Sequence, residues 1–151
     1  MRLPSIFLCV LLWAVASLRA ETSPSPAVTP WDHVTIPPMK TSIYVGSVKL
    51  ILGVFERQGS TLSATYEANV VPWFFWSETG QISITLDDAV LAKLAKGETA
   101  EFTGSGANQK NKPRKVSGRA QPADASSGKI KVRVMADGLE LIFNGTYQFG
   151  G

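Results

Sequence analysis

The sequence predicts a mainly β protein, an antiparallel β-sandwich or small β-barrel with one short α-helix, preceded by a signal peptide. Three observations lead to this fold class: a short apolar segment near the N-terminus, apolar residues at every second position in most of the remainder, and one stretch with helical spacing. With 151 residues, 44% hydrophobic and 18% charged, the chain has the size and composition of one globular domain.

Residues 1–20 have the organisation of a signal peptide. Arg2 precedes an apolar run over residues 6–16, which is about half of the roughly twenty residues that a membrane-spanning helix needs. Small residues follow, so we expect cleavage after Ala20, with Ala16 as the alternative. Cys9, the single cysteine, would leave with this segment. We therefore expect a periplasmic or secreted protein that has no transmembrane helix in its mature form and is not stabilised by disulfides.

Removal of residues 1–20 also changes the charge balance, because it leaves 13 basic and 12 acidic residues. Residues 21–30 are rich in Pro and Ser, a composition typical of an extended linker, and residues 31–151 form the predicted single β-rich domain. The basic residues are concentrated after position 101, so this domain is polarised without being globally cationic. A near-neutral mature chain without nucleic-acid-binding motifs argues against nucleic acid as a partner.

The first predicted hairpin joins residues 48–55, which are apolar at both parities, to residues 61–70, where apolar and polar residues alternate. A three-residue loop at positions 58–60 would place apolar residues opposite each other throughout. The pairs would be Val48 with Val70, Leu50 with Ala68, Leu52 with Tyr66 and Val54 with Ala64. A two-residue loop would break this match, so the pattern predicts a loop of odd length.

A second hairpin is predicted around Asp137 and Gly138, which favour the positive φ angles of a two-residue turn. The turn pairs Ala136 with Leu139, Val134 with Leu141 and Val132 with Phe143, so one face is apolar. The apolar residues of positions 139–149 stay in phase when this stretch is one continuous strand.

One helix is predicted between the hairpins. Asp87 or Asp88 would cap it, Leu91 and Leu94 belong to its apolar stripe, and Gly97 would end it. Weaker strand patterns occupy residues 31–36, 41–46, 82–86, 99–103 and 116–121. Residues 104–115 combine Gly, Asn, Pro and basic residues without an apolar period, which predicts a mobile surface loop.

The run Trp73, Phe74, Phe75 and Trp76 is the most unusual local feature and the candidate ligand-binding segment. On a strand, two of the four aromatic side chains would point to each face. We favour burial of the run in the core, as is general for Phe and Trp. The alternative is an exposed pair that stacks on a sugar ring or enters a membrane interface.

A row of cations at every second position is the candidate anion-binding surface. It comprises Lys129, Lys131 and Arg133, joined by Lys112, Arg114 and Lys115. These side chains would meet a phosphate- or sulfate-bearing polymer, an anionic lipid surface or an acidic partner. The simpler interpretation is a solvated sheet face whose charges discourage aggregation.

No set of residues has the spacing of a catalytic or metal site. The single histidine, His33, follows Asp32, but neighbours on a strand point to opposite faces. Glu56 and Glu67 could supply the two acids of a glycosidase, yet both occupy polar hairpin positions where solvation is the ordinary explanation. We therefore expect no enzymatic activity, no cofactor and no metal.

These patterns favour a non-catalytic binding or structural module of the cell envelope or secreted space, with a glycan, an anionic envelope polymer or a protein as partner. One alternative is a small outer-membrane-associated β-barrel, because residues 139–149, which end in Tyr147-x-Phe149, resemble the terminal strand of bacterial outer-membrane barrels. A second alternative is an enzyme with a dispersed carboxylate site.

Overall fold

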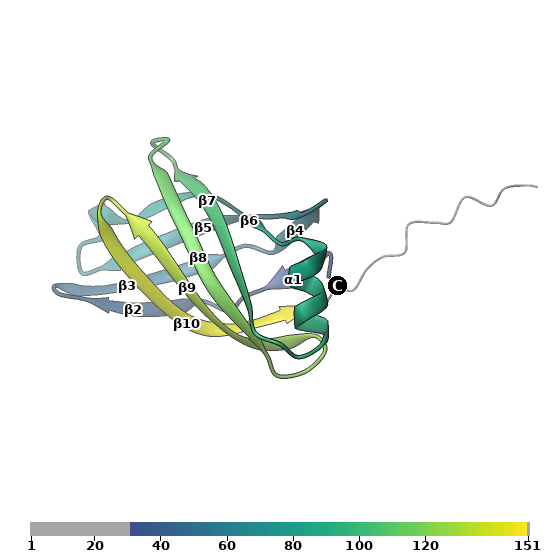
Figure 1. The fold of residues 1–151 in the computed structure, drawn as a ribbon. Helices are drawn as coiled ribbons and strands as arrows, with labels where there is room; N and C mark the ends of the chain where they lie inside the picture. The colour runs from purple at the N-terminus through teal and green to yellow at the C-terminus, as the bar shows by residue number, and fades with distance from the viewer. Residues whose placement is uncertain (1–30, 151) are drawn as a thin grey trace, which may run out of the picture.

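The chain folds into a closed, antiparallel β-barrel of ten strand segments, with one α-helix and one 3-10 turn (Figure 1). The computed structural model describes residues 31–150, so the predicted signal peptide and linker lie outside the described residues. The strands are β1 (His33–Thr35), β2 (Met39–Ile43), β3 (Gly46–Leu52), β4 (Phe55–Gln58), β5 (Thr61–Val71), β6 (Glu78–Thr85), β7 (Ala100–Asn108), β8 (Pro113–Pro122), β9 (Ser127–Ala136) and β10 (Leu139–Phe149). The 3-10 turn η1 (Phe74–Trp76) follows β5, and helix α1 (Asp88–Ala95) follows β6.

The ten segments make eight positions in the barrel wall. Segments β1 and β2 share one position, since β1 pairs with β4 and β2 pairs with β3. Segments β3 and β4 share the next, since both pair with β5. From β5 onward each strand pairs with its successor, and β10 returns to pair with β1 through Val34 and Phe149. Of the two predicted architectures, the barrel is therefore correct.

The first hairpin confirms three of the four predicted pairs but not the loop length. Val48, Leu50 and Leu52 pair as expected with Val70, Ala68 and Tyr66. The loop has two residues, however, because Gln58 pairs directly with Thr61. A β-bulge reconciles the two registers: residues 53–55 face only residues 64–65 between the paired stretches. The extra residue restores the apolar register that an odd loop would have given.

The second hairpin and the helix agree with the sequence. The predicted pairs of Ala136, Val134 and Val132 are present, and β10 is continuous from Leu139 to Phe149. Helix α1 begins after Asp87, whose Oδ1 accepts a hydrogen bond of 2.8 Å from the Val90 N–H. Leu91 and Leu94 of α1 are buried. Figure 1 shows α1 across one end of the barrel, beside the C-terminus.

The prediction of a mobile loop at residues 104–115 is wrong. Strand β7 continues to Asn108 and β8 starts at Pro113, so a short turn joins two long strands. Gly104 marks a close approach of β7 to β6, because a Cβ atom there would lie 2.3 Å from the carbonyl oxygen of Ser83. The weaker strand patterns overlap β1, β2, β6, β7 and β8, with different bounds.

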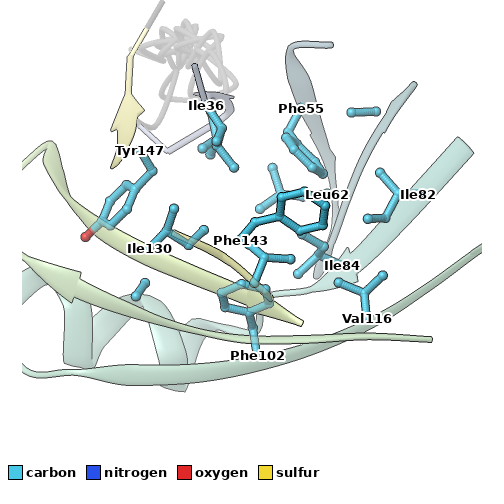
Figure 2. Packing of buried hydrophobic residues seen from close by; sticks show 14 of the residues in the cluster. Ile36, Phe55, Leu62, Ile82, Ile84, Phe102, Val116, Ile130, Phe143 and Tyr147 are labelled. Carbon is cyan, nitrogen blue, oxygen red and sulfur yellow. The ribbon is translucent and has the colours of Figure 1, made fainter. Parts of the chain in front are cut away.

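Along the strands, apolar side chains that point into the barrel alternate with polar side chains that point outward. Figure 2 shows this packing around Phe143, which with Phe55 is one of the largest fully buried side chains. The cluster also includes Leu62, Phe102 and Ile130 from three other strands. The core extends from Leu91 and Leu94 of α1 to Val48 and Val70, which lie toward the opposite end of the barrel.

Candidate functional site: the mouth of the barrel

The end of the barrel opposite α1 is open. We call this opening the mouth; it is a cavity of about 900 Å³ that the β2–β3, β5–β6, β7–β8 and β9–β10 connections surround. Its apolar lining includes Ile43, Val48, Val70, Phe75, Trp76 and Leu141. Eight-stranded barrels can hold one small ligand, and ligand cavities commonly measure about 300–1,000 Å³. The mouth therefore has the size and lining of a ligand-binding cavity.

An ion pair with two further hydrogen-bonding partners lines the mouth from inside the barrel. Arg114 of β8 contacts Glu78 of β6 with both ends of its guanidinium: Nε lies 2.8 Å from Oε1 and Nη2 lies 2.6 Å from Oε2. Tyr66 donates to Oε1 at 2.8 Å, and the Asn108 side-chain amide donates to Oε2 at 2.9 Å. We call these four residues the Glu78 network. Its geometry is that of a bidentate, charge-assisted pair.

The Glu78 network holds Glu78 ionised. Burial alone would raise the pKa of Glu78, but hydrogen bonds from Arg114, Asn108 and Tyr66 outweigh it and lower the pKa to about 2. Hydrogen bonding to Glu78 raises the pKa of Arg114, while burial and then the bond to Glu78 raise the pKa of Tyr66. At neutral pH the pair is thus fully charged and internally neutralised.

Two side chains at the rim extend the network toward solvent. Asp137, in the β9–β10 turn, lies 3.3 Å from Arg114 Nη2 through Oδ2, and its Oδ1 lies 3.8 Å from Lys112 Nζ. Arg114 is only 4% exposed, so its predicted place in an anion-binding surface is wrong: β8 directs it inward, toward Glu78. Position 114 has the same parity as the buried Val116 and Ala120, and this phase could have revealed it in the sequence.

The aromatic run 73–76 is exposed, and the prediction of burial is wrong. The strand ends at Val71, and Pro72 and η1 turn the chain, so the four side chains do not alternate across a sheet. Exposure ranges from 40% for Trp73 to 79% for Phe74. The rings contact one another instead, with Phe75 and Trp76 centroids 5.4 Å apart. Phe75 and Trp76 also line the mouth.

The predicted cationic row lies on the outer surface of the barrel, away from the mouth's interior. Lys129, Lys131 and Arg133 are exposed on β9, and Arg119 of β8 pairs directly with Lys131. Arg119, Lys131 and Arg133 line a shallow basin of about 250 Å³ together with Thr103, Ser117 and Glu101. Arg133 also lies 3.7 Å from Glu140. Lys115 is exposed on the same wall, and Lys112 is at the rim of the mouth.

The histidine and the acidic residues that were considered as catalytic candidates lie outside the mouth. His33 and Glu56 are exposed cross-strand partners on β1 and β4. Glu67 is exposed on β5 and accepts a hydrogen bond from Asn69. Within residues 31–150, no three His, Cys, Asp or Glu side chains gather as a metal site would require.

Comparison of the chain with protein-family models, with curated proteins and with solved structures found no match. In the part of the chain that the structure describes, no helix has the length and hydropathy needed to cross a membrane.

Proposed function

We propose that the protein is an exported, non-catalytic binding module that holds an apolar or amphipathic small molecule in the mouth of its barrel. The observation that carries the proposal is the cavity of about 900 Å³, open at one end of a barrel whose other end is packed. Export rests on the signal-peptide pattern of residues 1–20.

The composition of the mouth supports this class of ligand. Val48, Val70 and Leu141 offer apolar walls, and Phe75 and Trp76 offer aromatic surface at the entrance. The charges inside are balanced, since Arg114 faces Glu78 and Asp137 faces both Arg114 and Lys112. A balanced interior gives no strong preference for an ion. The ligand that fits has an apolar body and a hydrogen-bonding group that reaches Asp137 or Lys112.

The distribution of side chains favours this module over the two alternatives. A transmembrane barrel presents an apolar band to lipid and a polar lumen, whereas here Phe143, Val132 and Leu50 face inward and Lys131 and Glu67 face outward. For the alternative of an enzyme, Glu56 and Glu67 are exposed on β4 and β5, and neither of them lines the mouth.

Ligand binding in the mouth can be tested with the uncharged fluorescent probe N-phenyl-1-naphthylamine. Ala68 of β5 lines the cavity, so Ala68→Phe is expected to fill part of it and weaken probe binding by about tenfold or more. The matched control is Thr65→Phe, which adds a ring to the outer face of the same strand and should leave binding unchanged. Fluorescence titration measures affinity, and circular dichroism confirms that both variants fold.

Two results would contradict the mouth as a binding site. The first is that the unmodified protein does not enhance probe fluorescence. The second is that Ala68→Phe binds the probe as tightly as Thr65→Phe does.

The basin on the outer wall carries a second candidate function, the binding of a sulfate- or phosphate-bearing polymer. The specific observation is that Lys131 and Arg119 are direct cross-strand partners, so that two like charges face each other. Glu101, the partner of Arg119 on its other side, offsets one of these charges, and a bound anion would offset the other. Arg133 and the hydroxyl groups of Thr103 and Ser117 complete the set of donors around the basin.

Retention on heparin-agarose tests this second function. Neutralising the pair with Arg119→Gln and Lys131→Gln is expected to weaken heparin binding by about tenfold and reduce its dependence on salt. Lys93→Gln with Lys96→Gln removes two charges at the α1 end and serves as the control, with retention expected to change little. Equal losses in both double variants would mean that net charge, and not the basin, governs retention.

A further inference from the structure

Apolar side chains from three neighbouring connections project at the mouth. The β2–β3 turn exposes Tyr44 completely and Val45 by 53%. The β5–β6 connection exposes residues 73–76, and Leu139 at the start of β10 is 48% exposed. None of the three residues of η1 is buried. An exposed apolar cluster of this size on a single protein marks an interaction surface. We call Tyr44, Val45 and residues 73–76 the aromatic tip.

A hydrogen bond and contacts between aromatic rings hold the residues of the aromatic tip together. The indole N–H of Trp73 donates a hydrogen bond of 3.1 Å to the carbonyl oxygen of Val45, which ties the two connections together. The rings of Trp73 and Trp76 lie 5.9 Å apart, and those of Trp73 and Phe75 lie 5.8 Å apart. Because the Trp73 N–H is already satisfied, its ring can enter apolar surroundings without losing a hydrogen bond.

The chemistry of this end favours a phospholipid bilayer as the occupant. Trp and Tyr are the residues that concentrate at membrane interfaces, and Phe adds apolar area below them. Lys110 lies in the β7–β8 turn at the same end, where it complements anionic headgroups. Of the carboxylates there, Asp137 faces Arg114 and Lys112, and Glu140 faces Arg133. The aromatic tip and the flanking Lys110 thus match a lipid surface that contains anionic phospholipid.

We propose that the aromatic tip inserts into the interfacial region of a bilayer that contains anionic phospholipid, so that the mouth opens onto the lipid. This inference rests on the proposed function, since Phe75 and Trp76 belong to the tip and also line the cavity. An apolar ligand could then move between the bilayer and the mouth without crossing water.

Sedimentation with vesicles tests the insertion. The protein is mixed with vesicles of phosphatidylcholine alone or of phosphatidylcholine with phosphatidylglycerol. We expect binding to the mixed vesicles, and a loss of about tenfold or more in Phe74→Ser with Phe75→Ser, because two large exposed rings are removed. Val54→Ser changes an exposed apolar residue on the barrel wall and is expected to bind as the unmodified protein does.

Tryptophan fluorescence gives an independent readout of which end inserts. Trp73 and Trp76 lie in the aromatic tip, whereas Trp31 packs against Phe149 with centroids 4.5 Å apart. Brominated phospholipids are therefore expected to quench the emission of the unmodified protein and to quench Trp73→Phe with Trp76→Phe far less, although that variant keeps its aromatic surface. Equal quenching of the two proteins would overturn the proposed orientation.

The outcomes separate this inference from the proposed function. If the unmodified protein stays in the supernatant with both vesicle types but still binds N-phenyl-1-naphthylamine, membrane docking is overturned and the cavity is not. If vesicles retain the protein but the probe does not bind, docking is supported and the small-molecule proposal fails. A concentration-dependent dimer that is lost in Phe74→Ser with Phe75→Ser, without vesicle binding, would assign the tip to self-association and overturn docking.

Discussion

Replacing Glu78 with glutamine is expected to lower the free energy of unfolding by about 3 to 5 kcal/mol at neutral pH. The substitution keeps the shape of the side chain but leaves the guanidinium of Arg114, which is 4% exposed, without its bidentate partner. The hydrogen bonds from Tyr66 and Asn108 also lose their charged acceptor. Urea denaturation measures the change.

The matched control for this substitution is Glu67→Gln, at an exposed position of β5. It is expected to change the free energy of unfolding by less than about 0.5 kcal/mol. A similar small change in Glu78→Gln would show that Asp137 and solvent, and not Glu78, compensate the charge of Arg114.

The same substitution predicts a pH dependence whose sign follows from the lowered pKa of Glu78. The folded protein holds this pKa at about 2, against 4.5 for an unperturbed glutamate. The unfolded chain therefore takes up the proton first as the pH falls, so the stabilisation is present above about pH 4.5 and is lost between 4.5 and 2. The difference in unfolding free energy between the unmodified protein and Glu78→Gln should shrink across this interval.

Truncating Phe143 to alanine is expected to cost about 3 to 5 kcal/mol of unfolding free energy. Phe143 is 1% exposed and lies at the centre of the packed interior, where the surrounding strands cannot collapse around a lost ring (Figure 2). Calorimetry or urea denaturation measures the loss. Phe143 also lines a small cavity with Leu50, Tyr66 and Leu141, directly inside the mouth. The variant should therefore accept a larger apolar probe.

Asn144→Ala, one position along on the outer face of β10, is the control for Phe143→Ala. Its expected effect is below about 0.5 kcal/mol. If the two alanine variants unfolded at the same urea concentration, the inward orientation of Phe143 and the apolar filling of the barrel would both be in error.

The sequence was most informative where a strand has one buried and one solvated face. The pairing of β9 with β10 follows from the phase of Val132, Val134, Leu141 and Phe143, because a shift by one residue would expose them. The same phase argument could not predict the bulge at residues 53–55. The bulge allows a two-residue loop in place of a three-residue loop, and the apolar pairs beyond it stay the same.

The candidate site was less predictable because its parts meet only in three dimensions. Glu78 and Arg114 are on β6 and β8, and their phase within each strand shows that they face inward but not that they meet. Composition was misleading twice: glycines at residues 104–115 marked close strand contact and not mobility, and the aromatic run 73–76 lay in a turn where burial was expected. General burial tendencies do not apply to a segment that leaves the sheet.

The pairing of β1 with β10 has a consequence for how the protein is made. Val34 meets Phe149, so the ring of strands cannot be completed until a ribosome has synthesised the chain as far as position 149. Contacts between residues so distant in sequence also slow folding. A polypeptide that stays unfolded for this interval is in the state that a translocation channel accepts, which suits the export that we propose.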